Sequence, residues 1–431
     1  MKNKKITILG VGPVGLATAI GFASKDYKVT CYDISEKIIN SFKAGKSPIY
    51  ETNISDFIEK YKENILFTAN EKEALSNPDF VFLCVGTPCS KSGEVDMSAF
   101  WRAIECLLVN LKNDCYVIIK STVPVGTNRR LTKYLEQRNL DITLKVVSNP
   151  EFLAQGSSIV DTINASRIVI GAENQADGMA VAQLYSDFEG EKIVTTPASA
   201  EIIKYAANCY LAMRLSYIND IANVCEITNA NVEDVIRGVG LDTRIGCNYF
   251  SPGFGYGGSC FPKDTVAFHT QMQIEYGYEL ELLQATIDIN KRQSYRLSRK
   301  IVEDLKACNM ASVTVLGATF KAGTDDIRNS IAMDNIKFLV NQGYKVCIWD
   351  YVALDKCKEV FGDQVEYECS LERAIEKNEF ILIATDWDEI GQLDVNIFNG
   401  KRVYDGKNCL LKSKKDIKFK YFYIGGEINN D

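Results

Sequence analysis

The segment around residues 6–33 constrains the fold of this 431-residue chain more than any other. A short β-branched run at 6–9 is followed by a glycine-rich turn, by apolar residues at helical spacing, and by a second apolar run at 28–32. The turn matches the pattern G-x-G-x-x-G and consists of Gly10, Val11, Gly12, Pro13, Val14 and Gly15. A strand, a tight glycine turn, a helix and a second strand predict the start of a doubly wound α/β domain.

Asp33 ends the second of these strands, 18 residues after Gly15. The glycines would let a pyrophosphate approach the backbone, the helix amino terminus would offer N–H donors, and Asp33 would accept hydrogen bonds from ribose hydroxyls. Because a carboxylate repels a 2′-phosphate, the pattern predicts NAD rather than NADP as the cofactor. The alternative is a glycine-rich turn that binds no ligand.

Further strand-like runs at 80–85, 116–120, 145–148 and 167–170 alternate with helical stretches such as 98–111, which predicts a parallel sheet with helices on both faces. The C-terminal part repeats this pattern: a strand at 312–316, a helix at 335–340, a run that leads to Asp350, and a stretch at 380–387 that parallels 80–87. Between the two lies a helical pattern at 198–228 with apolar residues nearly all round, expected to be buried between domains or against another subunit. The fold class is therefore α/β, with two Rossmann-like doubly wound parallel-sheet domains joined by a long central helix.

Composition narrows the function classes. The 49 Lys and Arg against 56 Asp and Glu give a net charge of −7, which argues against nucleic acid or an anionic membrane as partner. The longest uninterrupted apolar runs have only the length of strands. No two of the fourteen cysteines are three positions apart and there is one histidine, so no metal site is expected. This pattern predicts buried thiols in a reducing, cytoplasmic compartment.

Cys260 lies at the end of a second glycine-rich stretch, residues 250–260, in which a helix is not expected. A cysteine is most often an inert core residue, but this one precedes Lys263 and Asp264. The lysine would favour the thiolate, and the carboxylate offers a base for a water molecule. Since a single histidine leaves few other reactive groups, Cys260 is a candidate nucleophile.

Other polar residues are candidates for the same chemistry. Lys204 and Asn208 are four positions apart on the apolar helical pattern, so they share a face and are expected to meet a ligand or partner, unless Lys204 is solvated at a helix edge. Glu151 and Thr122 each follow a predicted strand, where an open parallel sheet presents its ligand-binding loops. Glu151 is either a general base or a simple loop carboxylate, and Thr122 either faces water or cofactor or caps the next helix. His269 is expected on a helix in a structural role.

In this order, the motifs resemble the UDP-glucose 6-dehydrogenase branch of the UDP-glucose/GDP-mannose dehydrogenase family, which oxidises a sugar C6 alcohol to an acid. The resemblance spans about residues 4–425, and its most specific element is the stretch 254–264, Phe-Gly-Tyr-Gly-Gly-Ser-Cys-Phe-Pro-Lys-Asp. It implies an NAD-binding Rossmann domain at 1–197, a central region with the long helix and the catalytic loop at 198–295, and a Rossmann-like UDP-sugar-binding domain at 296–431. It also implies NAD and UDP-glucose as ligands and a homodimer formed through the central helix.

By this resemblance, Cys260 traps the C6 aldehyde as a thiohemiacetal, which a second NAD oxidises to a thioester that water cleaves to UDP-glucuronate. The other implied catalytic residues are Lys204 and Asn208 for developing oxyanions, Asp264 and Thr122 for positioning water or a proton acceptor, and Glu151 as hydrolytic base. The implied cofactor contacts beyond the glycine turn and Asp33 are Lys37, Thr87, Pro88, Thr122, Lys263 and Arg328. The implied substrate contacts are Glu151, Phe152, Leu153, Lys204, Asn208, Tyr249, Phe250, Ser251, Pro252, Gly253, Gly257, Lys321, Arg402 and, donated across the dimer, Arg244.

The chain departs from the resemblance at Gln155, where the family commonly has a second carboxylate. Glu151 would then act alone, or Gln155 would serve through hydrogen bonds only. Three alternatives stay open. The substrate is GDP-mannose or a UDP-N-acetylhexosamine, the chain is a nucleotide-binding regulatory protein with an inactive site, or it is a simple NAD-dependent alcohol dehydrogenase that yields one NADH per substrate.

Overall fold

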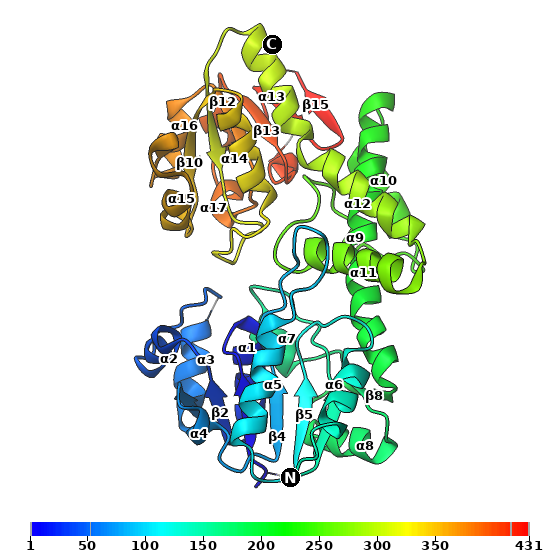
Figure 1. The fold of residues 1–431 in the computed structure, drawn as a ribbon. Coiled ribbons are helices and arrows are strands. Elements are labelled where there is room, and N and C mark those ends of the chain that lie inside the picture. The colour runs from blue at the N-terminus through cyan, green and yellow to red at the C-terminus, as the bar shows by residue number, and fades with distance from the viewer. Residues whose placement is uncertain (1, 52, 414–415, 430–431) are drawn as a thin grey trace. The chain divides into compact units, whose positions relative to one another are not determined.

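A computed structural model describes residues 2–51, 53–413 and 416–429 of the chain (Figure 1). The chain divides into two compact units, residues 1–207 (unit 1) and residues 208–431 (unit 2). Each unit contains one large sheet with helices, which confirms the predicted α/β fold with two Rossmann-like domains. Short 3₁₀ turns lie at Lys62–Asn64, Gly362–Gln364, Val395–Phe398 and Leu411–Ser413.

Unit 1 alternates strands and helices. Its strands are β1 (Ile6–Leu9), β2 (Val29–Tyr32), β3 (Ile65–Thr68), β4 (Phe80–Leu83), β5 (Cys115–Ile119), β6 (Leu144–Ser148), β7 (Arg167–Gly171) and β8 (Glu191–Thr195). Its helices are α1 (Pro13–Ala23), α2 (Glu36–Lys43), α3 (Ile54–Tyr61), α4 (Glu71–Ala74), α5 (Ser98–Asn110), α6 (Thr127–Glu136), α7 (Ser158–Ile163) and α8 (Gln175–Leu184). The predicted strands and the predicted helix at 98–111 therefore begin and end within about two residues of the observed elements.

The sheet of unit 1 has the strand order β3-β2-β1-β4-β5-β6-β7-β8. Its pairs are parallel except β6 with β7, which run antiparallel and pair only through Ser148 and Gly171. The predicted parallel sheet is therefore confirmed, with an exception where β7 runs opposite to β6, a reversal that residue periodicity does not reveal.

Helices cover both faces of this sheet. Successive side chains of a strand point to opposite faces, so each central strand contributes to two cores. In β4, Phe80 and Phe82 pack into one core with side chains of α1 and α8, whereas Val81 and Leu83 pack into another core with side chains of α5 and α6. A strand buried on both faces reads as a continuous apolar run, and this explains the run at 80–83.

Unit 2 contains the second sheet. Its strands are β9 (Ser312–Leu316), β10 (Lys345–Trp349), β11 (Glu366–Tyr367), β12 (Phe380–Ile383), β13 (Arg402–Asp405), β14 (Lys420–Tyr423) and β15 (Gly426–Ile428), in the order β11-β10-β9-β12-β13-β14-β15. Only the β14–β15 pair is antiparallel among the pairs in the described residues. The helices are α10 (Val232–Gly240), α11 (Phe261–Tyr276), α12 (Glu281–Ser294), α13 (Arg296–Ala307), α14 (Ile331–Asn341), α15 (Leu354–Phe361), α16 (Leu371–Lys377) and α17 (Asp388–Gly391). The order β10-β9-β12-β13 repeats the order β2-β1-β4-β5 of unit 1, which confirms the predicted internal repeat.

Helix α9 (Pro197–Thr228) begins in unit 1 and ends in unit 2, and its 32 residues confirm the predicted long helix (Figure 1). Its apolar side chains are not all buried in the chain. Tyr210, Tyr217 and Val224 follow one another at seven-residue spacing and are 55%, 49% and 52% exposed. Because seven residues make about two helical turns, these side chains form a stripe on one face of α9.

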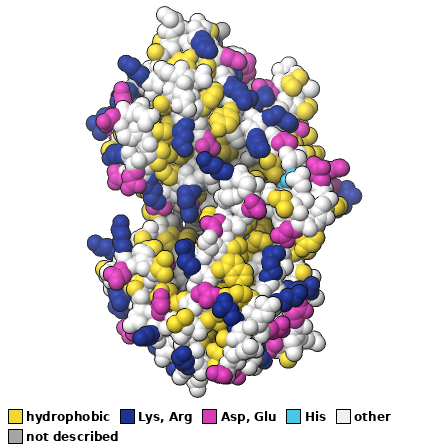
Figure 2. Space-filling model, in the orientation of Figure 1, with side chains coloured by type: hydrophobic (Ala, Val, Ile, Leu, Met, Phe, Trp, Pro, Cys, Tyr) yellow, Lys and Arg dark blue, Asp and Glu magenta, His cyan; other side chains and the backbone are white. Residues whose placement is uncertain are grey.

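The surface drawn in Figure 2 intermingles basic and acidic side chains, as expected for a nearly balanced composition. Within the described part of the chain, none of the helices combines the length and the apolar character that crossing a bilayer requires.

Candidate active site

The glycine turn of unit 1 joins the carboxyl end of β1 to the amino end of α1. Gly10 has a left-handed backbone (φ +93°), and a side chain there would meet the carbonyl oxygen of Cys84 at 2.8 Å. A side chain at Gly15 would lie 1.9 Å from the Gly10 carbonyl oxygen. At Gly12 a Cβ would meet no heavy atom of the described chain within 4 Å, so this part of the turn is open. The turn therefore leaves space at the α1 amino terminus where a pyrophosphate fits.

Asp33 lies where β2 ends, and its carboxylate is directed at this turn. One oxygen accepts a hydrogen bond from the Val11 amide at 2.9 Å and the other from the Ser35 amide at 2.9 Å. A carboxylate has about four acceptor positions, so Asp33 can still accept bonds from two ribose hydroxyls. The bond from the Val11 N–H holds the Asp33 carboxylate against the glycine turn. The next residue, Ile34, is exposed, so the chain is open to solvent beside Asp33. These residues fit a bound NAD, which, when present, accepts a hydride.

The other predicted cofactor residues of unit 1 lie on separate elements. Lys37 is exposed on α2, and Pro88 is exposed after β4. Thr87 is buried, and its hydroxyl donates to the carbonyl oxygen of Thr122 at 2.7 Å. This hydrogen bond connects the loop after β4 to the loop after β5 and so helps to hold the backbone of Thr122 in place.

Glu151 and Lys204 form a buried ion pair in unit 1. The Nζ of Lys204 lies 2.9 Å from Oε1 of Glu151, and Oε2 accepts from the Leu153 amide at 2.6 Å. Burial raises the pKa of Glu151, but the charge of Lys204, the Leu153 amide and the charge of Lys120 together hold that pKa below its ordinary value. Glu151 is thus ionised and Lys204 is not a solvated lysine at a helix edge.

Lys120, which follows β5, belongs to the same cluster, although it was not among the predicted site residues. Its Nζ donates to Oδ1 of Asn149 at 3.0 Å and lies 5.8 Å from the ring centre of Tyr185. Tyr185 donates to the same Asn149 oxygen at 2.6 Å. Burial lowers the pKa of Lys120 to about 8. The signal was available, since a lysine that ends an apolar strand is expected near the sheet edge where ligands bind.

A small pocket lies beside Lys204 within unit 1, with an open volume of about 10 Å³. This is close to the least space that holds one water molecule. Its lining consists of Ile119, Ser121, Thr122, Val123, Ser148, Pro150, Glu201 and Lys204. The carboxylate of Glu201 in turn accepts from the amides of Gly126 and Asn128. Glu201 therefore fastens α9 to the start of α6, a role that its place on an apolar helix did not suggest.

Cys260 lies in unit 2 at the amino end of α11, at the end of the glycine-rich loop. No helix occupies residues 250–260, as predicted. The Cys260 side chain is exposed, and its Sγ lies 3.7 Å from the Oγ of Ser259. The partial positive charge at the start of a 16-residue helix favours a thiolate at this position.

Asp264 is buried one turn further along α11. Its Oδ2 accepts from Nδ2 of Asn208 at 2.6 Å, and its Oδ1 lies 2.5 Å from Nζ of Lys263. The cation of Lys263 therefore contacts the Asp264 carboxylate. Lys204 and Asn208 are both buried on α9, as their shared face predicted.

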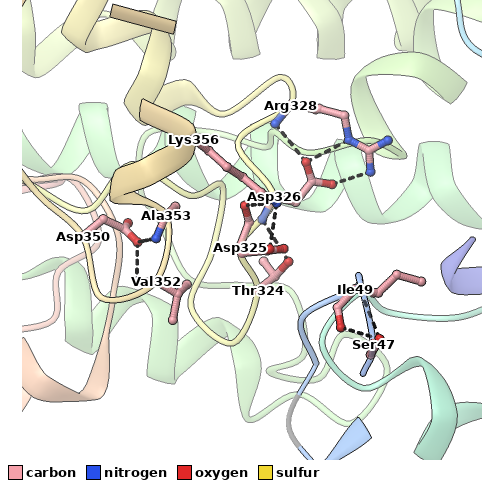
Figure 3. Close-up of polar contacts among 10 residues, drawn as sticks. All are labelled: Ser47, Ile49, Thr324, Asp325, Asp326, Arg328, Asp350, Val352, Ala353 and Lys356. Carbon is pink, nitrogen blue, oxygen red and sulfur yellow. Dashed lines mark hydrogen bonds and ion pairs between the residues drawn. The ribbon is translucent and has the colours of Figure 1, made fainter. Parts of the chain in front are cut away.

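Arg328 lies in the segment between β9 and α14. Asp326 holds its guanidinium through Nε at 2.9 Å and Nη2 at 2.6 Å, and Lys356 pairs with Asp325 beside it (Figure 3). The hydrogen bonds that Arg328 donates to Asp326 raise the pKa of Arg328, and the charge of Cys260 adds to this. The charges of Arg328 and Cys260 thus act on each other within unit 2.

The predicted substrate residues are not all brought together. Tyr249 has a left-handed backbone (φ +54°), and Phe250 and Pro252 are buried, whereas Ser251 is exposed. Lys321 follows the carboxyl end of β9 with its ammonium 5.9 Å from the Phe320 ring centre. The remaining predicted residues are Phe152, next to Lys204 and Arg167, Leu153, Gly253 and Gly257.

Arg402 is separated from Lys321. It begins β13, so it lies at the amino end of a strand whose carboxyl end is about 10 Å away, and it pairs with Glu379 at 3.3 Å.

Arg244 follows α10 and points away from the chain. Its side chain is 87% exposed and pairs with Asp242, with Nη2 and Oδ2 2.6 Å apart. The next turn is anchored by Arg214, which donates to the carbonyl oxygens of Ile245 and Gly246 at 2.8 and 2.7 Å. The backbone around Arg244 is therefore held while its guanidinium stays accessible.

His269 lies on α11 as predicted and is buried, and its Nε2 has no hydrogen-bond partner among the described residues. None of the fourteen cysteines, all of which lie in the described residues, forms a disulfide. The described residues contain no group of three or more His, Cys, Asp or Glu side chains that could hold a metal ion.

Comparison with known proteins gives matches along nearly the whole chain. Residues 4–189, 198–292 and 314–412 match, in order, the NAD binding, central and UDP binding domains of the UDP-glucose/GDP-mannose dehydrogenase family. The chain is 37% identical over 430 residues to UDP-glucose 6-dehydrogenase TuaD of Bacillus subtilis, covering 98% of this chain and 93% of that protein.

Two solved structures are similar over 98% of this chain. One is a UDP-glucose dehydrogenase from Pyrobaculum islandicum, 31% identical, with a TM-score of 0.91 and 98% of its own chain covered. The other is a UDP-D-ManNAc dehydrogenase from Pyrococcus horikoshii, 27% identical, with a TM-score of 0.84 and 99% of its chain covered.

Proposed function

The chain belongs to the UDP-glucose/GDP-mannose dehydrogenase family and is an NAD-dependent dehydrogenase, and from this premise we propose that it oxidises UDP-glucose to UDP-glucuronate in two successive steps. The likeness to UDP-glucose 6-dehydrogenases at 31–37% identity supports this substrate. The observation that carries the mechanism is the pairing of an exposed Cys260 at the start of α11 with a buried Asp264, bonded to Asn208, one turn later.

An oxidation from alcohol to acid needs a group that keeps the intermediate aldehyde. The alcohol first loses a proton and a hydride, and a bound NAD would accept the hydride. Sγ of Cys260 then adds to the aldehyde carbon, a C–S bond forms, and the former carbonyl oxygen takes a proton to give a thiohemiacetal. Loss of that proton and of a second hydride, which a second NAD would accept, gives a thioester. Water then adds to the thioester carbon, the C–S bond breaks, and the thiolate leaves as the acid forms.

The other proposed roles follow the charges of the side chains. Lys204 and Asn208 offer an ammonium and an amide N–H to oxyanions that develop at C6. Thr122 and Asp264 would position water or a proton acceptor. The pKa of Glu151 lies below its ordinary value, so the carboxylate is ionised and can accept a proton from water during hydrolysis, although as a weaker base than a free carboxylate.

Gln155 cannot share this proton, since an amide does not ionise. Nearby, Asp161 accepts from the Ala154 amide at 2.8 Å and from the Ser157 hydroxyl at 3.0 Å, so its carboxylate shapes the loop. We therefore propose Glu151 as the single hydrolytic base, with Gln155 limited to hydrogen bonds.

A homodimer through α9 is part of the proposal. The stripe of Tyr210, Tyr217 and Val224 is an apolar surface that a second copy would cover, and Ile227 extends it. The accessible guanidinium of Arg244 suits donation to the partner's substrate. Mixing inactive Arg244→Ala and Cys260→Ala subunits should restore part of the activity, whereas a fully active monomer would contradict shared sites.

The division into 1–197, 198–295 and 296–431 remains a proposal, supported by family matches that fall within these bounds. The cytoplasmic location predicted from the cysteine pattern likewise stays a prediction. A UDP-N-acetylhexosamine is the second candidate substrate, because a UDP-D-ManNAc dehydrogenase shares the fold at a TM-score of 0.84. GDP-mannose belongs in the same test.

A panel of these nucleotide sugars tests the function directly. With the correct substrate, the wild type should form two NADH per acid, and a carbonyl trap should collect no free aldehyde. Cys260→Ala should lose acid formation but keep its fold and NAD binding. Cys260→Ser should turn over very slowly, with an acylated enzyme visible by intact-protein mass spectrometry, since an oxygen ester resists hydrolysis more than a thioester. One NADH per substrate, or acid formation by Cys260→Ala near the normal rate, would contradict the proposal.

A further inference from the structure

The glycine-rich loop before Cys260 has no regular secondary structure, yet side-chain amides bind its backbone at two points. At the first, the Gly253 N–H donates to Oδ1 of Asn219 at 2.8 Å, and the Gly253 carbonyl oxygen accepts from Nε2 of Gln293 at 2.9 Å. At the second, Asn290 makes both bonds itself: its Oδ1 accepts from the Tyr256 N–H at 2.7 Å, and its Nδ2 donates to the Tyr256 carbonyl at 3.0 Å.

The amides come from two helices that are distant from the loop in sequence. Asn219 lies on α9, and Asn290 and Gln293 lie on α12. Gln293 is itself held, because its Oε1 accepts from Nδ2 of Asn223 at 3.1 Å. Asn219 and Gln293 are buried, so their bonds are shielded from competing water.

The amide of Asn290 also explains a glycine of the loop. Gly255 has a left-handed backbone (φ +105°), and a side chain there would lie 2.2 Å from the Asn290 Oδ1. The loop thus comes close to the amide, and a side chain at 255 would displace it. An amide suits this position because it offers one donor and one acceptor without a net charge, so the loop is held without a charge that would disturb the Cys260 thiolate.

The clamped backbone leads directly into the nucleophile. Gly258 donates its N–H to the Asn329 carbonyl at 3.0 Å, and Cys260 follows two residues later at the start of α11. We propose that Asn290 is a positioning residue for the reaction, together with Asn219 and Gln293. These three side chains hold the loop in the conformation that presents Cys260 to the sugar. This inference rests on the proposed role of Cys260.

The side-chain amides also provide hydrogen-bond partners for backbone groups of Gly253 and Tyr256. If this were their whole role, removing one of them would lower the stability of the protein but not its kcat. Positioning has a further consequence. Displacing a reacting group by about 1 Å costs up to about 100-fold in rate. Loss of the Asn290 clamp should therefore lower kcat, while the KM for NAD stays unchanged.

The test compares Asn290→Ala with Gln284→Ala, a control on the same helix. Gln284 is also an α12 amide, but it donates to Asp288 on that helix, at 2.9 Å. In the ligand-free enzyme, hydrogen exchange read by mass spectrometry should show faster exchange across residues 250–260 in Asn290→Ala than in wild type. Its kcat should fall about 10- to 100-fold with a KM for NAD within twofold of wild type. Gln284→Ala should match wild type in both measurements.

Two results would overturn the inference: unchanged exchange in the loop, or faster exchange with a kcat within twofold of Gln284→Ala. If Asn290→Ala does not fold, Gln293→Ala replaces it, since this substitution removes the donor to the Gly253 carbonyl and adds no charge near Cys260. The same two criteria then apply. Should the wild type fail on UDP-glucose, the exchange measurement still stands, and kcat is compared with the nucleotide sugar that the panel identifies. The two failures are thus separate.

Discussion

In both units a glycine with a left-handed backbone follows the first central strand, Gly10 (φ +93°) after β1 and Gly317 (φ +96°) after β9. Each glycine N–H donates to the last residue of the next strand, to Tyr32 at 2.9 Å in unit 1 and to Trp349 at 2.7 Å in unit 2. In each unit the next strand is followed by an aspartate that accepts from the amide after the glycine. The left-handed glycine and its two hydrogen bonds are therefore present twice, although only the first turn continues as G-x-G-x-x-G.

The two aspartates differ in what else they bind. Asp33 accepts one further bond within the described chain, from Ser35, and is partly exposed. Asp350 is buried and accepts from the amides of Val352 and Ala353 (Figure 3). It also accepts from the amides of Ala318 and Thr319 and from the indole N–H of Trp387. A carboxylate with five donors has no acceptor position left for a ribose. The comparison thus shows that a similar turn can leave its aspartate open or closed to a ribose, and of these two aspartates only Asp33 is open.

The largest expected effect is on stability, from Asp350→Ala. The substitution leaves five buried donors without their acceptor, so the free energy of unfolding should fall by about 3–5 kcal/mol. Urea unfolding measures this. The NAD dissociation constant of the folded fraction should stay within twofold of wild type. A loss of NAD affinity on this substitution would break the comparison, because it would place a cofactor contact in unit 2.

The second effect concerns stability as a function of pH. Strands β5 and β13 hold corresponding positions in the two sheets, and each has a buried ionisable residue at its carboxyl end, Lys120 after β5 and Asp405 in β13. Burial lowers the pKa of Lys120 to about 8 and raises that of Asp405. An unfolded chain keeps its lysines protonated to about pH 10.4. Between pH 8 and that value, the unfolded state therefore binds more protons than the native state, so Lys120 makes stability rise with pH.

Lys120→Met should remove this rise. The wild type should gain about 3 kcal/mol of unfolding free energy relative to the variant between pH 7.5 and 10.5, as measured by urea unfolding at several pH values. Lys145→Met is the control, because Lys145 is exposed and its bond to Asp177 raises its pKa. A difference that stays constant with pH would mean that Lys120 is protonated throughout.

Sequence reasoning predicted the parts of this comparison that depend on neighbouring residues. The first glycine turn was recognisable because it follows a short apolar strand, and Asp33 and Asp350 were recognisable because each comes at the end of another such strand. The hydrogen bond from Trp387 that occupies Asp350 was not recognisable from the sequence, since Trp387 lies 37 residues from Asp350 and meets it only after the sheet forms. The clamp on the Cys260 loop was missed for the same reason: Asn290 is 34 residues from Tyr256.

The third effect is on cofactor choice. Asp33→Ala should weaken NAD binding about 10- to 100-fold, because hydrogen bonds to a charged acceptor contribute about 1.5–3 kcal/mol. The wild type should use NAD far better than NADP, and Asp33→Ala should narrow this preference, since the repulsion of a 2′-phosphate is gone. Kinetics with both cofactors test this. Comparable efficiency of wild type with NAD and NADP would contradict the assignment of Asp33.

The smallest expected effect is on the stability of unit 2 and comes from removing a single hydrogen bond, the one that Trp387 donates to Asp350. Trp387→Phe removes the indole N–H that donates to Asp350 at 3.2 Å but keeps an aromatic ring against Tyr351, whose ring centre is 5.4 Å away. The other four donors to Asp350 remain, so the free energy of unfolding should fall by about 1–2 kcal/mol, less than for Asp350→Ala. In the double variant Trp387→Phe/Asp350→Ala, the effect of the first substitution should shrink, because its acceptor is already gone. Fully additive effects in this cycle would show that Trp387 stabilises unit 2 by packing alone, and the closure of the second turn would then rest on its backbone amides.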